Sequence, residues 1–174
     1  MIRFAIPALL MTALLAGCDR GTQTAQQSEA DALPEGLILT AEPAGAQDLA
    51  AAKQGAQVGD EVVIRGVVGG QVKPLAPNRA MLTLIDPSVT TCDKMAMAGD
   101  GCPTPWDACC EDPDELLAKS ATVQVIDEQG RPIRRGLDGV GGIAPNKPLV
   151  IKGTVREAQG PSIVIDADGV YVDG

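Results

Sequence analysis

Apolar and polar residues alternate in several short runs between residue 59 and the end of the chain. A two-residue period of this kind predicts β-strands with one buried face. The longest run, residues 61–72, is largely apolar on both faces, which is typical of a central strand or of one that bends between two packed sheets. Gly66, Gly69 and Gly70 allow such a bend. Four further strands are expected at residues 80–86, 121–127, 149–157 and 162–172.

Helical segments are expected to be few and short. The alanine-rich residues 47–54 predict one short helix. A second helix is expected at residues 113–119, because Asp112 can cap its first turn and Pro113 suits its first position. Residues 36–40 form a short apolar run that predicts one more strand ahead of the first helix.

The glycines and aliphatic residues of these runs follow a known pattern. Residues 59–68 read GDEVVIRGVV, residues 82–86 read LTLID, and residues 151–155 read IKGTV. The pattern resembles the OB fold, which implies a mainly β domain, a small five-stranded OB-like barrel over residues 59–174, with residues 35–58 as a lead-in. OB barrels often bind oligonucleotides or oligosaccharides. An immunoglobulin-like sandwich also needs short alternating strands and is the alternative fold.

One segment departs from the OB pattern. Residues 87–119 lie between the second and third expected strands, where the fold usually has a tight hairpin, and they hold four of the five cysteines. We call this segment the insertion. Residues 102–107, together with the doublet at 109–110, resemble a segment of uncharacterised secreted bacterial proteins. We expect the insertion to form the functional surface, because it is the feature that this chain adds to an OB-like barrel.

The N-terminus has the features of an export signal. Arg3 precedes an apolar run that is too short for an ordinary membrane-spanning helix, and the run ends in Leu-Ala-Gly before Cys18. This ending resembles the lipobox of bacterial lipoproteins. The resemblance implies a signal peptide at residues 1–17, lipid such as palmitate on Cys18, and a flexible tether over residues 18–34. An ordinary signal peptide with Cys18 beside its cleavage site is the alternative.

Lipidation of Cys18 implies a place in the bacterial cell envelope, with the domain facing the periplasm and the lipid bilayer as a partner. Asp19, directly after the cysteine, resembles an inner-membrane retention signal. The sequence therefore favours the inner over the outer membrane.

Composition narrows the functions that we expect. The net charge is −9 and only 2 % of the residues are aromatic. Nucleic-acid binders need cations against phosphate and aromatic rings against bases, so we expect no nucleic-acid partner. The chain has no histidine, which excludes Ser-His-Asp and Cys-His nucleophiles and HExxH zinc sites. No constellation supports an enzyme.

The cysteines of the insertion are expected to form disulfides. Cys92, Cys102, Cys109 and Cys110 make an even number in a chain that is expected to be exported. A bridge between the adjacent Cys109 and Cys110 needs a strained ring, so the doublet is expected to pair with Cys92 and Cys102. On this interpretation the chain has no cofactor.

The alternative is a soft-metal site. Thiolate and thioether ligands select copper(I) or zinc, and the insertion offers both kinds of ligand, although it lacks a CxxC pair. The candidate ligands are Cys92, Met95, Met97, Cys102, Cys109 and Cys110.

The remaining candidates have simpler interpretations. Trp106 is either a plug over the barrel or an exposed recognition residue, and it is the candidate for a binding surface. Asp166, Asp168 and Asp173 lie in residues 166–174, which lack the spacing of a calcium loop, so we interpret these aspartates as part of a turn in the last hairpin. The predicted function is a membrane-anchored, non-enzymatic binding or structural module. Its partner beyond the bilayer would be an envelope protein or a small ligand.

Overall fold

A computed structural model of the chain describes residues 31–95 and 103–174. Cys18, Met97 and Cys102, together with the expected signal peptide and most of the expected tether, lie outside the described residues. The elements are β1 (Gln47–Asp48), α2 (Leu49–Ala52), β2 (Glu61–Val68), β3 (Met81–Ile85), α3 (Pro113–Ala118), β4 (Ser120–Gln124), the 3₁₀ turn η1 (Val140–Gly142), β5 (Pro148–Gln159) and β6 (Ser162–Val172).

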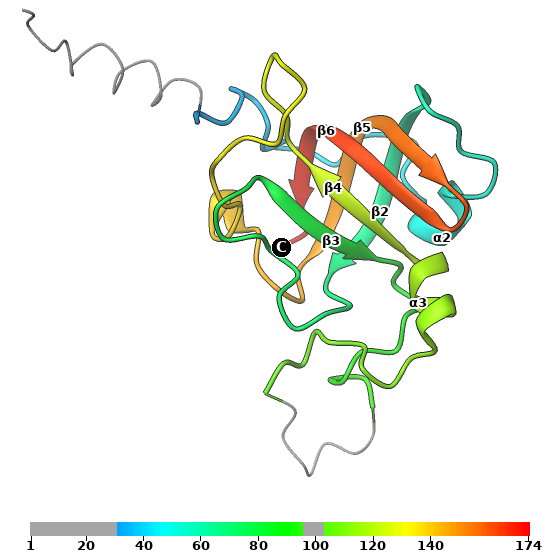
Figure 1. Ribbon diagram of the computed structural model, residues 1–174. Coiled ribbons are helices and arrows are strands. Elements are labelled where there is room, and N and C mark those ends of the chain that lie inside the picture. Colours follow the sequence, from blue (N-terminus) through cyan, green and yellow to red (C-terminus); the bar gives the residue numbers. More distant parts are fainter. Residues whose placement is uncertain (1–30, 96–102) are drawn as a thin grey trace, which may run out of the picture.

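Five of the strands close into a barrel (Figure 1). The order is β2-β3-β4-β6-β5, and β5 pairs back onto β2. All neighbours are antiparallel except β4 and β6, which are parallel. This arrangement confirms the mainly β, OB-like prediction, and a single continuous sheet rules out the immunoglobulin-like sandwich. Closure is uneven, because β2 pairs with β3 only through Val67–Ile85 and Val68–Leu84.

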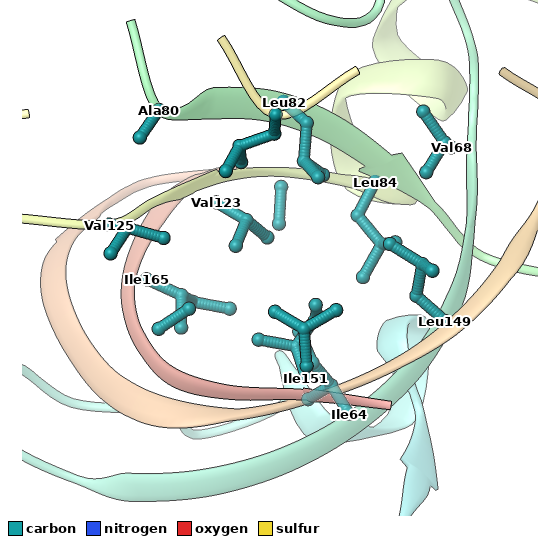
Figure 2. Packing of buried hydrophobic residues seen from close by; sticks show 14 of the residues in the cluster. Ile64, Val68, Ala80, Leu82, Leu84, Val123, Val125, Leu149, Ile151 and Ile165 are labelled. Carbon is teal, nitrogen blue, oxygen red and sulfur yellow. The ribbon is translucent and has the colours of Figure 1, made fainter. Parts of the chain in front are cut away.

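Aliphatic side chains fill the barrel (Figure 2). Alternate residues of each strand point inward, as the two-residue period of the sequence predicts. Among the largest fully buried side chains of the described residues, none is aromatic. The labelled core residues in Figure 2 are Ile64, Val68, Ala80, Leu82, Leu84, Val123, Val125, Leu149, Ile151 and Ile165.

Glycine sets the bend and the end of β2. A Cβ added at Gly66 would lie 2.6 Å from the Leu84 Cγ atom and 2.7 Å from the Ile85 carbonyl oxygen. Only glycine therefore lets β2 pass this close to β3 while still pairing with β5. The expected strand 61–72 ends early, at Val68, because the chain turns away at Gly70, whose φ of 87° favours glycine.

Three sequence predictions need correction. Residues 36–40 form only an isolated parallel bridge, Ile38 to Val170, because the backbone bonds of Leu37 and Leu39 to the sheet both go to this one residue of β6. The expected helix 47–54 is one turn long, since its first two residues pair with β2 instead. Asp166 and Asp168 lie not in a turn but in β6, where Arg156 and Gln124 hold the Asp166 carboxylate. The turn of this hairpin lies at residues 160–161, between the two strands that the sequence predicts at residues 149–157 and 162–172.

The second predicted helix is confirmed. The Asp112 side chain accepts hydrogen bonds from the backbone N–H groups of Asp114 at 2.9 Å and Glu115 at 3.1 Å, and α3 then runs from Pro113 to Ala118. Within residues 31–95 and 103–174, no helix has the length and apolar character needed to cross a membrane.

Candidate functional site

The described part of the insertion is a folded unit that rests on the barrel. Ile85, at the end of β3, packs with Val89 and Ala108 of the insertion in a second small core. Val67 of β2 and Leu116 of α3 flank this core. Figure 1 shows the insertion extending from one end of the barrel, with α3 leading back into β4. The described part of the insertion is thus packed against the ends of β2 and β3.

Two backbone hydrogen bonds bring the described cysteines together. The Cys92 N–H donates to the Asp107 carbonyl oxygen at 2.8 Å, and the Asp93 N–H donates to that of Pro105 at 3.0 Å. The Cys92 sulfur therefore lies 3.6 Å from the Cys109 sulfur, which in turn lies 3.8 Å from the Cys110 sulfur. A disulfide bond is about 2.05 Å long, so these sulfurs are in contact without being bonded to one another.

The cysteines differ in exposure. Cys92 is half-buried, whereas Cys109 and Cys110 are exposed. The expected proximity of Cys92 to the doublet is present in the structure. The disulfides themselves remain a prediction, and Cys102 lies outside the described residues.

The soft-metal site also stays a prediction. Among residues 31–95 and 103–174, no group of three or more Cys, Asp or Glu side chains is arranged to hold a metal ion. Met95 is half-buried, and Met97 and Cys102 lie outside the described residues.

Trp106 lies against the loop that follows β2. Its indole Nε1–H donates to the Val72 carbonyl oxygen at 3.2 Å, and its own carbonyl oxygen accepts from the Gly70 N–H at 2.8 Å. The side chain is half-buried and does not belong to the barrel core. Trp106 therefore fastens the insertion to the β2–β3 loop.

Two neighbouring hollows lie on the outer side of β3. Their volumes are about 200 and 370 Å³, and both are lined by Gln71 and Thr83. The Gln71 Nε2 donates to the Thr83 hydroxyl and so bridges the two hollows. The other lining residues are Lys73, Pro74, Ala76, Met81, Leu82 and Thr122 in the smaller hollow, and Gly70, Pro113, Leu116, Leu117 and Ser120 in the larger one.

Exposed apolar side chains border the same surface. Three large hydrophobic residues of the described chain are exposed: Val58, Val72 and Leu117. Leu117 lines the larger hollow, and Val72 follows Gln71 in the loop to which Trp106 is fastened. We call the residues that line the two hollows, together with Val72 and Trp106, the β3 face.

The β3 face is almost without charge. Lys73 is the single charged residue among those that line the two hollows in the described part of the chain. The chain as a whole carries 23 acidic residues. An uncharged, partly apolar surface on so acidic a protein suits a partner that offers apolar side chains and hydrogen-bonding groups.

A third hollow, of about 460 Å³, lies at the 127–131 turn and has a structural explanation. The Asp127 carboxylate accepts from the backbone N–H groups of Gln129 and Arg131 and from the Arg131 guanidinium. The backbone bond from Arg131 is the largest cause of the lowered pKa of Asp127. The Asp127 carboxylate therefore stabilises the turn, and this explains its presence beside the hollow.

Asp86 is a buried carboxylate at the end of β3 that binds α2 and the start of the insertion. It is 4 % exposed and accepts from the Ala50 N–H at 2.7 Å and the Ser88 N–H at 2.9 Å. Burial raises the pKa of the Asp86 carboxyl, but the hydrogen bonds from the Ser88 side chain and from both N–H groups outweigh it and keep the pKa below its usual range. Asp86 therefore stays ionised and joins α2 to the start of the insertion.

Comparisons with known proteins show likeness in fold alone. No family model matches the chain, and no curated protein matches it. A solved structure that is similar is the telomere capping protein Ten1 from Saccharomyces pombe. The two chains are 15 % identical over 71 % of this chain and 76 % of that one, with a TM-score of 0.32. A likeness of this size carries no argument about function.

The expectation of no nucleic-acid partner is nevertheless corrected. The similar solved structure is a telomere capping protein, and this finding contradicts an exclusion made from composition. The physical reason is that a net charge of −9 is summed over the whole chain, whereas binding depends on the charge of one face. The exclusion is withdrawn. The chain is thus similar in fold to an OB protein and matches no family model.

Proposed function

We propose that the chain is a lipid-anchored protein of the bacterial cell envelope whose barrel is a non-enzymatic binding module. The lipobox-like sequence before Cys18 supports the anchor, and the polar residues that follow supply a tether. The observation that carries the binding role is the β3 face, where two hollows adjoin and exposed Val72 and Leu117 border them.

The partner that best fits the β3 face is a segment of another envelope protein. Leu116, Leu117 and Met81 offer apolar contacts, while Thr83 and Thr122 offer hydroxyl groups. A polypeptide presents apolar side chains beside backbone N–H and C=O groups, which matches this mixture. A tethered domain would meet such a partner at the membrane surface.

Cross-linking in intact cells tests the binding role. A photoreactive amino acid is placed at position 72 or 117, both on the β3 face, and at position 58 as the matched control, since Val58 is also exposed but does not belong to the β3 face. We expect the same discrete protein adduct from positions 72 and 117 and none from position 58. Leu117→Asp is expected to lower the adduct yield at position 72 about tenfold, because a charge replaces an apolar contact. Equal adducts from all three positions, or no adduct at all, would refute the proposal.

The lipid anchor has its own test. Cys18→Ala removes the residue that would carry lipid, so the variant is expected to lose membrane association and appear in the soluble fraction. Fractionation after carbonate washing measures the change, and Cys110→Ala serves as a control that also removes one cysteine. A Cys18→Ala protein that still fractionates with membranes would contradict the anchor.

A further inference from the structure

We propose that Cys92 and Cys109 form a thiol–disulfide exchange pair, in which exposed Cys109 takes up a sulfur-linked group from a disulfide compound and Cys92 releases it. The inference rests on the arrangement of the sulfurs in the insertion and is independent of the binding role of the β3 face.

The two thiols are held ready to bond. Backbone hydrogen bonds from Cys92 to Asp107 and from Asp93 to Pro105 fix the two segments side by side. The Lys94 ammonium adds bonds to the Pro87 and Val89 carbonyl oxygens at 2.8 and 2.9 Å, which tie down the chain after Cys92. The sulfur separation of 3.6 Å is a contact distance, so the two sulfur atoms need to approach by about 1.5 Å to reach the length of a disulfide bond.

The exposure of each thiol assigns its role. Cys109 is exposed, so an incoming disulfide compound reaches its sulfur first. Cys92 is half-buried beside it, so its sulfur is less accessible than that of Cys109 while it remains in contact with the Cys109 sulfur. This is the order of access that a nucleophilic thiol and a resolving thiol require.

The exchange balances in two steps. The Cys109 thiol releases its proton to solvent and the thiolate attacks the compound RSSR, forming a mixed disulfide while one RS⁻ leaves and takes up a proton. The Cys92 thiol then releases its proton and attacks the Cys109 sulfur, so that the mixed disulfide breaks and the second RS⁻ leaves. Two cysteine thiols are oxidised by two electrons, and one disulfide compound is reduced to two thiols.

Among the cysteines of residues 31–95 and 103–174, Cys110 is the competing resolving thiol, and the geometry disfavours it. Its sulfur lies 3.8 Å from that of Cys109, almost as near as Cys92. A bridge between residues that are adjacent in sequence closes a small ring with poor disulfide geometry. Cys92 reaches Cys109 from a separate segment and forms a large ring, so it resolves the mixed disulfide first.

Trapping the mixed disulfide tests the proposal. The purified full chain is reduced, freed of reductant and exposed briefly to oxidised glutathione, and its adducts are followed by intact mass and peptide mapping. The wild type is expected to form the Cys92–Cys109 bridge and keep no glutathione. Cys92→Ser is expected to keep one glutathione on Cys109 at least about tenfold longer, because the intramolecular attack is lost. The matched control Cys110→Ser is expected to behave as the wild type does.

Two results would overturn the proposal. One is a Cys92→Ser protein that loses its glutathione as fast as the wild type. The other is a wild-type bridge that joins Cys109 to any cysteine other than Cys92, an outcome that is mapped on the unmodified sequence and so does not depend on how a variant folds.

Discussion

Replacing the buried Asp86 with alanine is expected to lower the free energy of unfolding by about 3 kcal/mol, because two partly buried N–H groups lose a charged acceptor and a cavity is left where the carboxylate was. Those donors belong to Ala50 and Ser88, at 2.7 and 2.9 Å. The Asp86 N–H itself donates to the Lys119 carbonyl oxygen at 2.8 Å, so the residue sits where β3, α2 and the end of α3 meet. For a domain of this size the loss corresponds to a fall in melting temperature of about 10 °C.

The effect of Asp86 depends on pH in a defined direction. Its folded-state pKa lies below the usual value of 3.8, so the carboxylate stabilises the folded chain above that value. The stabilisation is lost as the pH falls below 3.8 and through the lower folded-state pKa. The difference in unfolding free energy between wild type and Asp86→Asn should therefore be full at neutral pH and shrink in acid.

Chemical denaturation at a series of pH values measures both effects. Asp173→Ala is the matched control, since this exposed carboxylate should contribute no more than about 0.5 kcal/mol. If Asp86→Ala were no less stable than Asp173→Ala, the bonds to α2 and Ser88 would not contribute to stability as described.

The barrel could be predicted from the sequence because its strands repeat a local rule. Inward residues such as Ile64, Leu84 and Ile151 recur at every second position, and this period is visible without any tertiary knowledge. The first helix could not be predicted at its true length. Gln47 and Asp48 have a nearby strand to pair with, and that tertiary pairing overrides their helical pattern.

The candidate sites depend on contacts that the sequence does not encode locally. Gln71 lies in the irregular loop after β2 and donates a hydrogen bond to Thr83 of β3. Trp106 lies in the insertion and donates a hydrogen bond to Val72 of the same loop. The contact of Cys92 with Cys109 likewise follows from backbone pairing across the insertion. Composition could name the cysteines and the tryptophan as unusual, but only the fold shows which neighbours they have.

The sequence does not predict the β3 face, because the residues that form it are unremarkable in the chain. Thr83 and Thr122 are ordinary outward residues of half-buried strands, and Leu117 is an ordinary helical leucine. Each becomes notable only because the insertion places α3 beside β3 at the end of the barrel. The alternation of Thr83 with buried Leu82 and Leu84 was the one available signal, since it marked the outer side of this strand.

The close approach of β5 and β6 makes Gly153 the most demanding glycine of the barrel. A Cβ at this position would lie 2.2 Å from the Asp166 carbonyl oxygen and 3.0 Å from the Ala167 Cα atom. Both are backbone atoms of the paired strand, and the register of the two strands shifts between Lys152 and Gly153. Side-chain rotation cannot relieve such a contact, so the strands themselves would have to separate.

Gly153→Ala is therefore expected to cost about 3 kcal/mol of unfolding free energy, as overpacking against backbone does at its upper range. Gly160→Ala, in the turn of the same hairpin, is the matched control: nothing lies within 4 Å of its added Cβ, and its φ is 55°. The left-handed conformation alone should cost this control about 1 kcal/mol. Thermal unfolding of the two variants separates the explanations. Equal losses would mean that the β5–β6 pair tolerates the methyl group and that Gly153 is not required for closing the barrel.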